Sequence, residues 1–336
     1  MTPDAPAFSV IVPTRGDDAA LMRLAAALER QTLPPGRWER IVVFDGVEPR
    51  PLVAARLKSL GAQVVRLEQR SGPGAARNAG AKQAHGAFLA FTEDDVTPAP
   101  DWLERALARL DADPALDVLE GTTLKPGGRP VRVLADAGPS WIPTTLFVRR
   151  GLFERVGGYH EGFFDRSSGV YFREDSDLGF TLEEAGARIA RAGDVQVEHP
   201  VEHPRFLDPL RWARRYRMDA LLEARHARLF RERIEVHRLG PFTVRRPIVR
   251  AAIAYLLAIA GALIAALARQ PGLAWALLAV AAVALVAIWA KWRFHPLRLP
   301  VALLVPPVLV GSLIAGRAAA RAALSTRSRP GTRAEM

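Results

Sequence analysis

The sequence contains no cysteine among its 336 residues. Disulfide frameworks, thiolate zinc sites and cysteine nucleophiles are therefore excluded, and the redox compartment stays open. Residues 1–8 also lack the basic stretch and apolar run of a secretory signal, since Pro3, Asp4 and Pro6 lie there. We accordingly expect the N-terminal domain to face the cytoplasm.

The common phosphate-binding loops are missing as well. Gly72-Pro73-Gly74 is rich in glycine, but it matches neither the Walker loop nor the dinucleotide fingerprint. We interpret it as a loop that lets the backbone approach a ligand closely.

Acidic residues are fewer than basic ones, which leaves a formal net charge of +11. Between residues 205 and 250 there are thirteen arginines and five acids, a local charge of +8. Such a stretch could bind nucleic acid or an anionic membrane surface. Because a long apolar segment follows directly, the pattern favours membrane lipids, and we expect no nucleic-acid partner.

Short apolar runs alternate with helical patterns over the first half of the chain. The predicted strands are 8–13, 41–44, 64–67 and 88–91, and the predicted helices are 19–30 and 74–85. This alternation predicts an α/β fold with a mostly parallel sheet covered by helices on both faces. Ligands of such sheets bind at the carboxyl ends of the strands, where Thr14, Asp45 and Glu93-Asp94-Asp95 lie.

Three apolar stretches follow, at 248–268, 273–290 and 299–316. The first two are long enough to cross a hydrocarbon layer of about 30 Å, although a pair of core helices in a soluble domain would have similar composition. The third contains Pro306-Pro307, which disfavours a regular straight span. Basic residues flank all three stretches, and an interfacial or re-entrant third segment would keep them all on the cytoplasmic side of a multi-pass cell-membrane protein.

These patterns divide the chain into a folded domain and a membrane part. The predicted divisions are an α/β domain at 1–205, a basic amphipathic juxtamembrane segment at 206–247, a membrane region at 248–316 and a basic tail at 317–336.

Glu93-Asp94-Asp95 is the strongest acidic cluster. Adjacent carboxylates repel one another, and a divalent cation among them makes the arrangement favourable. Mg²⁺ or Mn²⁺ there would bind a diphosphate in turn. An exposed acidic turn before the next helix is the alternative.

An ordered set of motifs, each weak alone, resembles glycosyltransferase family 2. The set consists of Val10-Ile11-Val12-Pro13-Thr14, Asp45-Gly46, Gly74-Ala75-Ala76-Arg77-Asn78-Ala79-Gly80, the acidic cluster and Arg173-Glu174-Asp175-Ser176-Asp177-Leu178. The resemblance covers about residues 7 to 200. It implies a GT-A fold, a nucleotide-diphosphate sugar donor and an inverting reaction.

The resemblance also implies roles around the nucleotide. Pro13 and Thr14 match the strand-end pair beside it, and Asp45 matches the carboxylate that contacts the base. The family usually has two consecutive acids where this chain has Phe44-Asp45. Arg77 would lie near the diphosphate, unless it is a solvated helix-face arginine.

Within the acidic cluster, Asp95 matches the metal ligand of the family. Glu93 and Asp94 match residues that contact ribose or metal-bound water. His199 is a candidate further metal ligand, and His203 in the second Glu-His-Pro unit is a candidate for a structural role.

Asp175 matches the base that takes the acceptor proton, and a helix acid favoured by the dipole is the alternative. Trp141 and Trp212 could stack on a sugar or lie at a membrane interface.

The resemblance thus predicts a metal-dependent membrane glycosyltransferase that acts on a lipid-linked or cell-envelope glycan. Transfer onto a polyprenyl phosphate is one rival, and a non-catalytic scaffold on a degenerate GT-A fold is another.

Overall fold

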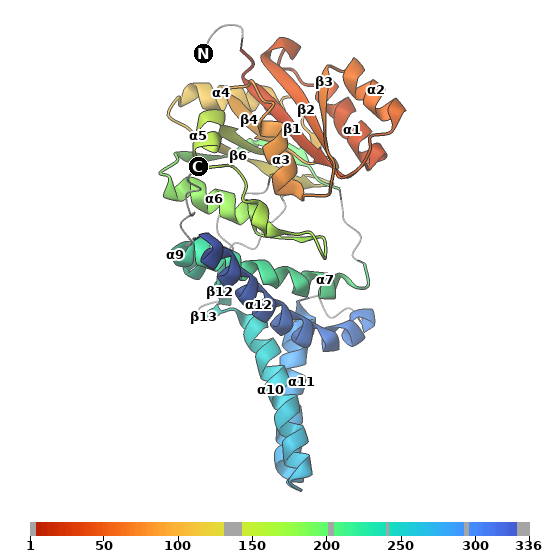
Figure 1. Ribbon diagram of the computed structural model, residues 1–336, viewed down its shortest axis with the longest axis vertical. Coiled ribbons are helices and arrows are strands. Elements are labelled where there is room, and N and C mark those ends of the chain that lie inside the picture. Colours follow the sequence, from red (N-terminus) through yellow and green to blue (C-terminus); the bar gives the residue numbers. More distant parts are fainter. Residues whose placement is uncertain (1–4, 131–142, 201–204, 240–241, 292–295, 328–336) are drawn as a thin grey trace, which may run out of the picture. The chain divides into compact units, whose positions relative to one another are not determined.

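The computed structural model describes residues 5–130, 143–200, 205–239, 242–291 and 296–327 (Figure 1). The described residues form two compact units. The first comprises residues 5–130 and 143–200, and the second comprises 205–239, 242–291 and 296–327.

A mixed sheet forms the centre of the first unit. Its strands are β1 Phe8–Thr14, β2 Trp38–Asp45, β3 Ala62–Leu67, β4 Phe88–Phe91, β5 Thr97–Pro98, β6 Val118–Lys125, β7 Arg129–Pro130, β8 Leu146–Arg149 and β11 Ile189–Glu198. Their order is β3-β2-β1-β4-β8-β6-β11-β5, with β7 paired to β6. β3, β2, β1 and β4 are parallel, as the alternation predicts, whereas β8 runs antiparallel between β4 and β6.

Helices cover both faces of this sheet. They are α1 Asp18–Glu29, η1 Pro35–Arg37, α2 Pro51–Ser59, α3 Pro73–Ala81, α4 Trp102–Ala112, α5 Arg150–Arg155, η2 Glu161–Phe163 and α6 Glu174–Glu184. Because side chains alternate along β1, Val10 packs with α1, α2 and α4, while Ile11 packs with α3, α5 and α6. The predicted α/β GT-A fold is confirmed, and a small hairpin of β9 Phe164–Asp165 and β10 Val170–Tyr171 precedes α6.

The helix expected over 74–85 is shorter than predicted and ends at Ala81. The backbone N–H groups of His85 and Gly86 instead donate to the Glu39 carboxylate, at 2.6 and 3.3 Å. These bonds turn the chain into β4, whose first residue, Phe88, is in register with Phe8.

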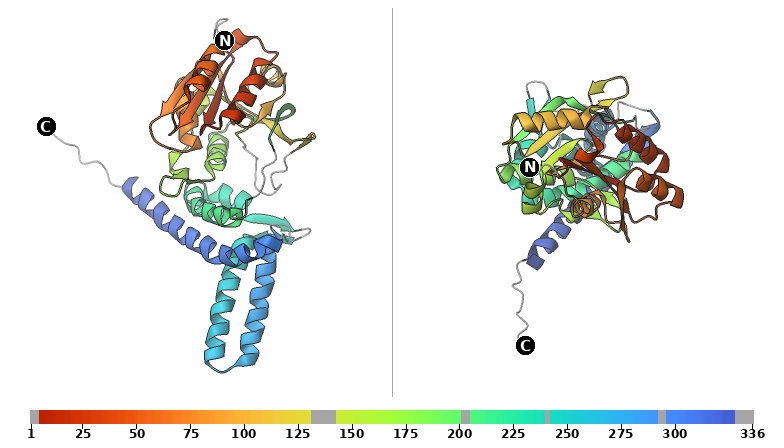
Figure 2. Two further views of the ribbon diagram at one scale, coloured as in Figure 1. Left: turned by 90° about the vertical axis from the view of Figure 1, so that its right-hand side faces the viewer. Right: turned by 90° about the horizontal axis from the view of Figure 1, so that it is seen from above.

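The second unit consists of short elements followed by three long helices. These elements are α7 Asp208–Arg215, η3 Tyr216–Met218, α8 Asp219–Arg225, α9 Ala227–Leu229, η4 Phe230–Ile234, β12 Val236–Leu239, β13 Phe242–Arg245, α10 Pro247–Leu267, α11 Pro271–Ala290, η5 Pro296–Arg298 and α12 Leu299–Arg327. By length and composition, α10, α11 and α12 are each apolar enough to cross a membrane. α10 and α11 form an antiparallel hairpin (Figure 2).

The expected proline interruption at Pro306-Pro307 does not break the third apolar segment. α12 remains helical through both residues. Apolar helices tolerate proline where neighbouring groups or water satisfy the freed carbonyl groups, and α12 packs against several other elements here.

Candidate functional site

Three parallel strands bring the predicted site residues to one edge of the sheet. Thr14, at the end of β1, is in register with Phe44 of β2, so Asp45 lies one position beyond. β4 lies on the other side of β1 and ends at Phe91, immediately before the acidic cluster. The carboxyl ends of these strands therefore converge as the α/β pattern predicts.

A cleft of about 520 Å³ opens at this edge. It is lined by Pro13, Thr14, Arg15, Asp17, Asp45, Arg70, Gly72, Pro73, Arg77, Glu93, Asp94, Asp95, Tyr171 and His199. Eight of the nine site residues predicted from the sequence belong to this lining. Asp175 is the ninth, and it does not belong to the described lining of the cleft.

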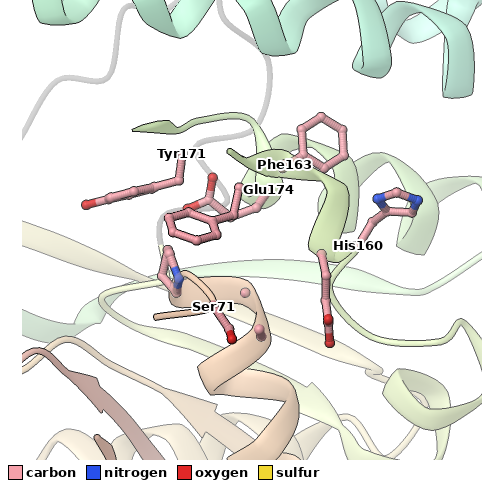
Figure 3. A pocket seen from close by; sticks show the side chains of 10 residues that line it. Ser71, His160, Phe163, Tyr171 and Glu174 are labelled. Carbon is pink, nitrogen blue, oxygen red and sulfur yellow. The ribbon is translucent and has the colours of Figure 1, made fainter. Parts of the chain in front are cut away.

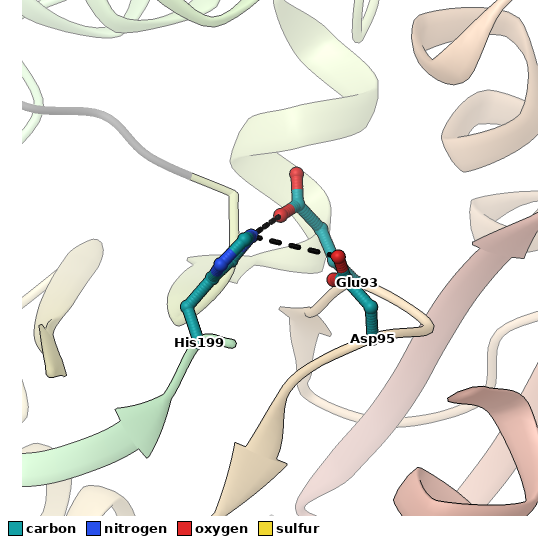
Figure 4. A group of neighbouring side chains, drawn as sticks. All are labelled: Glu93, Asp95 and His199. Carbon is teal, nitrogen blue, oxygen red and sulfur yellow. Dashed lines mark ion pairs between the residues drawn. The ribbon is translucent and has the colours of Figure 1, made fainter. Parts of the chain in front are cut away.

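The acidic cluster divides between two environments. Asp94 accepts a hydrogen bond of 2.5 Å from the Thr14 hydroxyl group, whose oxygen in turn accepts the Gly16 N–H at 3.0 Å. Glu93 and Asp95 instead face His199 (Figure 4). Asp94 therefore ties the end of β4 to the end of β1, while its two neighbours remain available for a ligand.

Glu93, Asp95 and His199 form a group suited to a single cation. His199 Nε2 lies 3.8 Å from Glu93 Oε2 and 3.6 Å from Asp95 Oδ2, and the three candidate ligand atoms lie within 4.8 Å of one another. All three residues are half-buried. Two carboxylates and an imidazole are an ordinary ligand set for a divalent metal. Glu93, which the family resemblance places near ribose or metal-bound water, is here a candidate metal ligand.

Strand pairing explains how His199 reaches residues about a hundred positions earlier. β5 begins two residues after Asp95 and pairs antiparallel with the end of β11, where Glu198 is in register with Thr97. The N–H of His199 then donates to the carbonyl of Leu124 at 2.8 Å. His203, the other histidine considered, lies outside the described residues.

Arg77 lies inside the protein next to this group. Its side chain is 2% exposed, which excludes the solvated helix-face alternative. Nη2 lies 3.4 Å from Glu93 Oε1, and the guanidinium group lies 5.3 Å from the Tyr159 ring centroid. Burial raises the pKa of Glu93, and the charge of Arg77 opposes that rise. Arg77 thereby helps to keep Glu93 ionised.

Two donors of Arg77, Nε and Nη1, have no hydrogen-bond partner among the described residues. A buried donor without a partner costs free energy unless water or a ligand satisfies it. Arg77 lines the cleft, so an anion there would be such a partner.

Asp45 holds the loop between β3 and α3. Its two carboxylate oxygens accept the N–H groups of Ser71 and Gly72, at 2.6 and 2.9 Å, and the residue is buried. Gly72 adopts a φ of +89°, and a Cβ there would lie 2.6 Å from the Phe164 ring. Both carboxylate oxygens of Asp45 therefore already accept hydrogen bonds from the loop that lines the cleft. If Asp45 also contacts the base, as predicted, the same carboxylate would serve both purposes.

Asp175 and Glu174 occupy the first turn of α6. Asp175 Oδ1 accepts the N–H of Ser176 at 2.6 Å. Glu174 is only 8% exposed and lines a smaller pocket of about 10 Å³, room for about one water. Figure 3 shows this pocket between Ser71, two residues before α3, and the segment that carries Tyr171 and Glu174.

Burial raises the pKa of Glu174 to about 7, and the charge of Asp175 adds to that rise while Arg77 opposes it. The structure thus places a carboxyl group that titrates near neutrality directly beside the predicted base. Sequence reasoning singled out Asp175 alone for the chemistry.

Four further residues line the cleft that sequence reasoning did not single out: Arg15, Asp17, Arg70 and Tyr171. Arg15 directly follows the end of β1, and Arg70 follows the end of β3, so the strand-end rule could have found both. Arg70 is held in place by the carbonyl of Gly169 at 3.0 Å. No comparable signal indicated Tyr171, because β10 has only two residues.

Curated relatives match a little over half of the chain. A pre-mycofactocin glycosyltransferase of Mycobacterium tuberculosis is 29% identical over 215 residues, covering 57% of this chain and 42% of that protein. The glycosyltransferase AglE of Haloferax volcanii is 26% identical over 199 residues, covering 54% of this chain and 65% of that protein. The match therefore spans less than two thirds of either relative.

Solved structures share the fold. The structure of Staphylococcus aureus TarS residues 1–349 in complex with UDP has a TM-score of 0.53 at 20% identity, covering 94% of this chain and 91% of that one. The mannosyltransferase PcManGT from Pyrobaculum calidifontis, in complex with GDP-Man and Mn²⁺, has a TM-score of 0.55 at 22% identity, covering 93% and 87%. Residues 9–177, half of the chain, match the family described as Glycosyl transferase family 2. On this match and on the fold, the chain belongs to glycosyl transferase family 2.

Proposed function

We propose that this chain is an inverting glycosyltransferase. It would move a sugar from a nucleotide-diphosphate sugar to a lipid-linked or cell-envelope glycan at the cytoplasmic face of the cell membrane. One observation carries the proposal: the candidate metal ligands Glu93, Asp95 and His199 share a cleft with cationic side chains.

The cleft suits a diphosphate-linked donor in size and charge. A volume of about 520 Å³ lies within the range of small-molecule sites, about 300–1,000 Å³. Arg15, Arg70 and Arg77 line it, and guanidinium groups bind phosphate oxygens well. The complexes of the two structural neighbours with UDP and with GDP-Man support a donor of this class.

A divalent cation held by Glu93, Asp95 and His199 would stabilise the charge that develops on the leaving diphosphate. The imidazole nitrogen favours Mn²⁺ over Mg²⁺, because Mg²⁺ prefers oxygen ligands. The Mn²⁺ in the PcManGT complex supports this assignment.

The transfer forms one bond and breaks another. The acceptor oxygen attacks the anomeric carbon from the face opposite the diphosphate, and the bond from that carbon to the diphosphate oxygen breaks. We assign the acceptor proton to Asp175, at the first turn of α6. Oδ1 of Asp175 accepts from Ser176, so Oδ2 is the atom assigned to the proton.

The position of Asp175 supports a second candidate for the acceptor, a polyprenyl phosphate. A polyprenyl phosphate is already ionised and has less need of a base. Because Asp175 does not belong to the described lining of the cleft, transfer onto such a phosphate is the alternative acceptor chemistry. The non-catalytic scaffold is less favoured, because the cleft contains a complete candidate metal site.

The test is thermal unfolding of the full chain in detergent with a panel of UDP- and GDP-sugars, with and without Mn²⁺. A donor at about a hundred times its dissociation constant adds about 2.7 kcal/mol to the free energy of unfolding, enough to see as a higher midpoint. We expect one donor class to stabilise the protein only with Mn²⁺. The same donor should then label a membrane-extract acceptor, and no stabilisation by any donor would contradict the proposal.

A further inference from the structure

α12 raises a question that its composition leaves open. Residues Leu299–Arg321 are long and apolar enough to cross a membrane, as are α10 and α11. A crossing by α12 would place the end of the chain on the far side of the membrane from the start of α10. Its packing within the second unit distinguishes a spanning helix from one that lies along the surface.

One stripe of α12 is buried. Ala302, Val305, Leu309, Leu313 and Gly316 follow one another at intervals of three or four residues, which is one face of a helix. This stripe packs against α7, η3 and α8 as well as α10. A Cβ at Gly316 would overlap the backbone oxygen of Arg217 in η3, so the two backbones are in direct contact.

The stripe meets the α10–α11 hairpin only at its base among the described residues. Val305 and Leu309 share a cluster with Ala213 of α7, Ala252 near the start of α10 and Ile288 near the end of α11. Figure 2 shows α12 leaving the base of the hairpin at a wide angle rather than running beside it.

The rest of the hairpin is apolar and exposed. Leu257, Leu267 and Val283 have exposed fractions of 68%, 76% and 71%. Such a surface fits hydrocarbon, whereas α12 covers only the end where α10 begins and α11 finishes.

α7, on which α12 packs, has the residue composition of a helix at the level of the lipid headgroups. α7 carries exposed Arg211 and Arg214, and Lys291 at the end of α11 lies 3.5 Å from the Trp212 ring centroid. Arginine is costly in hydrocarbon, while tryptophan and basic residues are typical of the interface. Trp212 thus lies among interface-type residues of the second unit, and Trp141 lies outside the described residues. An α12 in contact with α7 lies at the same depth.

The two prolines in α12 also favour a position at the headgroup level. Pro306 and Pro307 cannot donate to the carbonyl groups of Ala302 and Leu303, four residues earlier. Leu303 is exposed. Water and headgroups can satisfy the carbonyl of the exposed Leu303 at the interface, while hydrocarbon cannot, and Ala302 is buried within the protein.

We propose that α12 lies in the plane of the membrane at the headgroup level, across the base of a two-helix hairpin. Its exposed Leu303, Leu304 and Ile314 face the acyl chains. Arg317 and Arg321 lie on the same side of α12 nearer its C-terminal end, and their long side chains extend to lipid phosphates. The chain therefore crosses the membrane twice, and α12 stays on the side of the membrane where α10 begins. This inference rests on the membrane location in the proposed function but not on the sugar transfer.

The first test determines on which side of the membrane each segment lies. Because the chain has no native cysteine, a single introduced cysteine is the only thiol that can react. Single variants Ala55→Cys on the first unit, Gln270→Cys between α10 and α11, and Ala319→Cys on α12 each place one thiol at an exposed position. Membrane-impermeant maleimide is applied to intact spheroplasts and to inside-out vesicles. We expect Ala319→Cys to react on the side of Ala55→Cys, and Gln270→Cys on the other. Reaction of Ala319→Cys on the Gln270→Cys side would overturn the proposal.

Depth is the second test. A fluorophore on Ile314→Cys, which would lie deep in the bilayer if α12 crossed it, is compared with the same fluorophore on Val283→Cys, an exposed apolar position within α11. We expect shallow nitroxide lipids to quench the first label most, and deep nitroxide lipids the second. Deep quenching of both labels would mean a spanning or re-entrant α12 and would also overturn the proposal. Neither result depends on transferase activity, so a failed activity assay leaves this inference untouched.

Discussion

The two units of this protein treat apolar surface in opposite ways. The first unit buries its apolar side chains on the two faces of one sheet, where the clusters around Val10 and Ile11 lie. Of the twenty large apolar side chains that are exposed among the described residues, eighteen belong to the second unit. The first unit thus covers its apolar side chains within its own fold, while the hairpin of the second exposes apolar surface of the kind that fits a membrane.

The cleft lies in the first unit, and the three membrane-length helices lie in the second. The chemistry and the attachment are thus expected to depend on different units, so a variant in one should leave the other function intact.

The largest effect on metal binding and sugar transfer is expected from a substitution of Asp95. Asp95→Asn removes a charged candidate ligand while keeping the shape of the side chain, so Mn²⁺ binding and sugar transfer should fall below detection. The protein should still sediment with membranes, because the second unit is unchanged. Metal titration, a transfer assay and membrane fractionation measure the three properties.

The matched control for that variant is Asp111→Asn, an exposed acid on α4. It should leave all three properties as in the wild type. Normal transfer by Asp95→Asn, or by wild type in excess chelator, would show that the metal assignment is wrong.

The next effect concerns Asp175. If it takes the acceptor proton, Asp175→Asn lowers turnover by about 10²–10⁴-fold, while donor affinity stays near the wild-type value. Donor titration and turnover on a membrane-extract acceptor measure the two quantities. Asp177 is fully buried, which makes it a poor control, so the comparison variant is Glu184→Gln near the exposed end of the same helix.

Two results would redirect the assignment of Asp175. Weakened donor binding in Asp175→Asn would make it a nucleotide-site residue. Unchanged turnover would favour the phosphate acceptor, for which a base is less needed.

A smaller effect, on the pH dependence of stability, is expected from a substitution of Glu174. Its folded pKa of about 7 lies above the ordinary glutamate pKa of 4.5, so the folded state holds the proton more tightly than the unfolded state. This contribution to stability is present at low pH and is lost as the pH rises from about 4.5 to 7. Glu174→Gln should therefore reduce the fall in the free energy of unfolding between pH 5 and pH 8 by about 1–3 kcal/mol.

Thermal unfolding midpoints at four pH values from 5 to 8 measure that change. Glu184→Gln should keep the wild-type dependence on pH. An unchanged dependence in Glu174→Gln would mean that Glu174 does not titrate in this range.

The smallest effect is expected from removal of the second unit. A chain ending at residue 204 keeps every residue that lines the cleft, so its donor affinity should match that of the full chain within the error of titration. It should also leave the membrane fraction. A cut at residue 247 would be less suitable, because Ala213 of α7 would lose its contacts with α10 and α12. Failure of residues 1–204 to fold would show that the first unit depends on the second for its stability.

Local patterns account for what the sequence predicted correctly. The alternation of apolar strands and helices predicted β1 to β4 and the edge at which Thr14 and Asp45 meet, since these strands are near neighbours in sequence. It did not predict the antiparallel β8, because an apolar run contains no signal of its direction in a sheet. The proline pair disfavoured a regular third helix, yet α12 is helical through both residues, because packing around α12 outweighs the local preference.

The sequence by itself determined the sheet edge, the acidic cluster and the length of the apolar helices, because each depends on the periodicity or composition of a short stretch. Only the tertiary structure decided that His199 joins Glu93 and Asp95, since that grouping needs β11 to pair with β5 across about a hundred residues. It also decided that Arg70 and Tyr171 share the cleft and that α12 crosses the base of the hairpin. Such contacts depend on which surfaces pack together, and no single segment of the sequence contains that information.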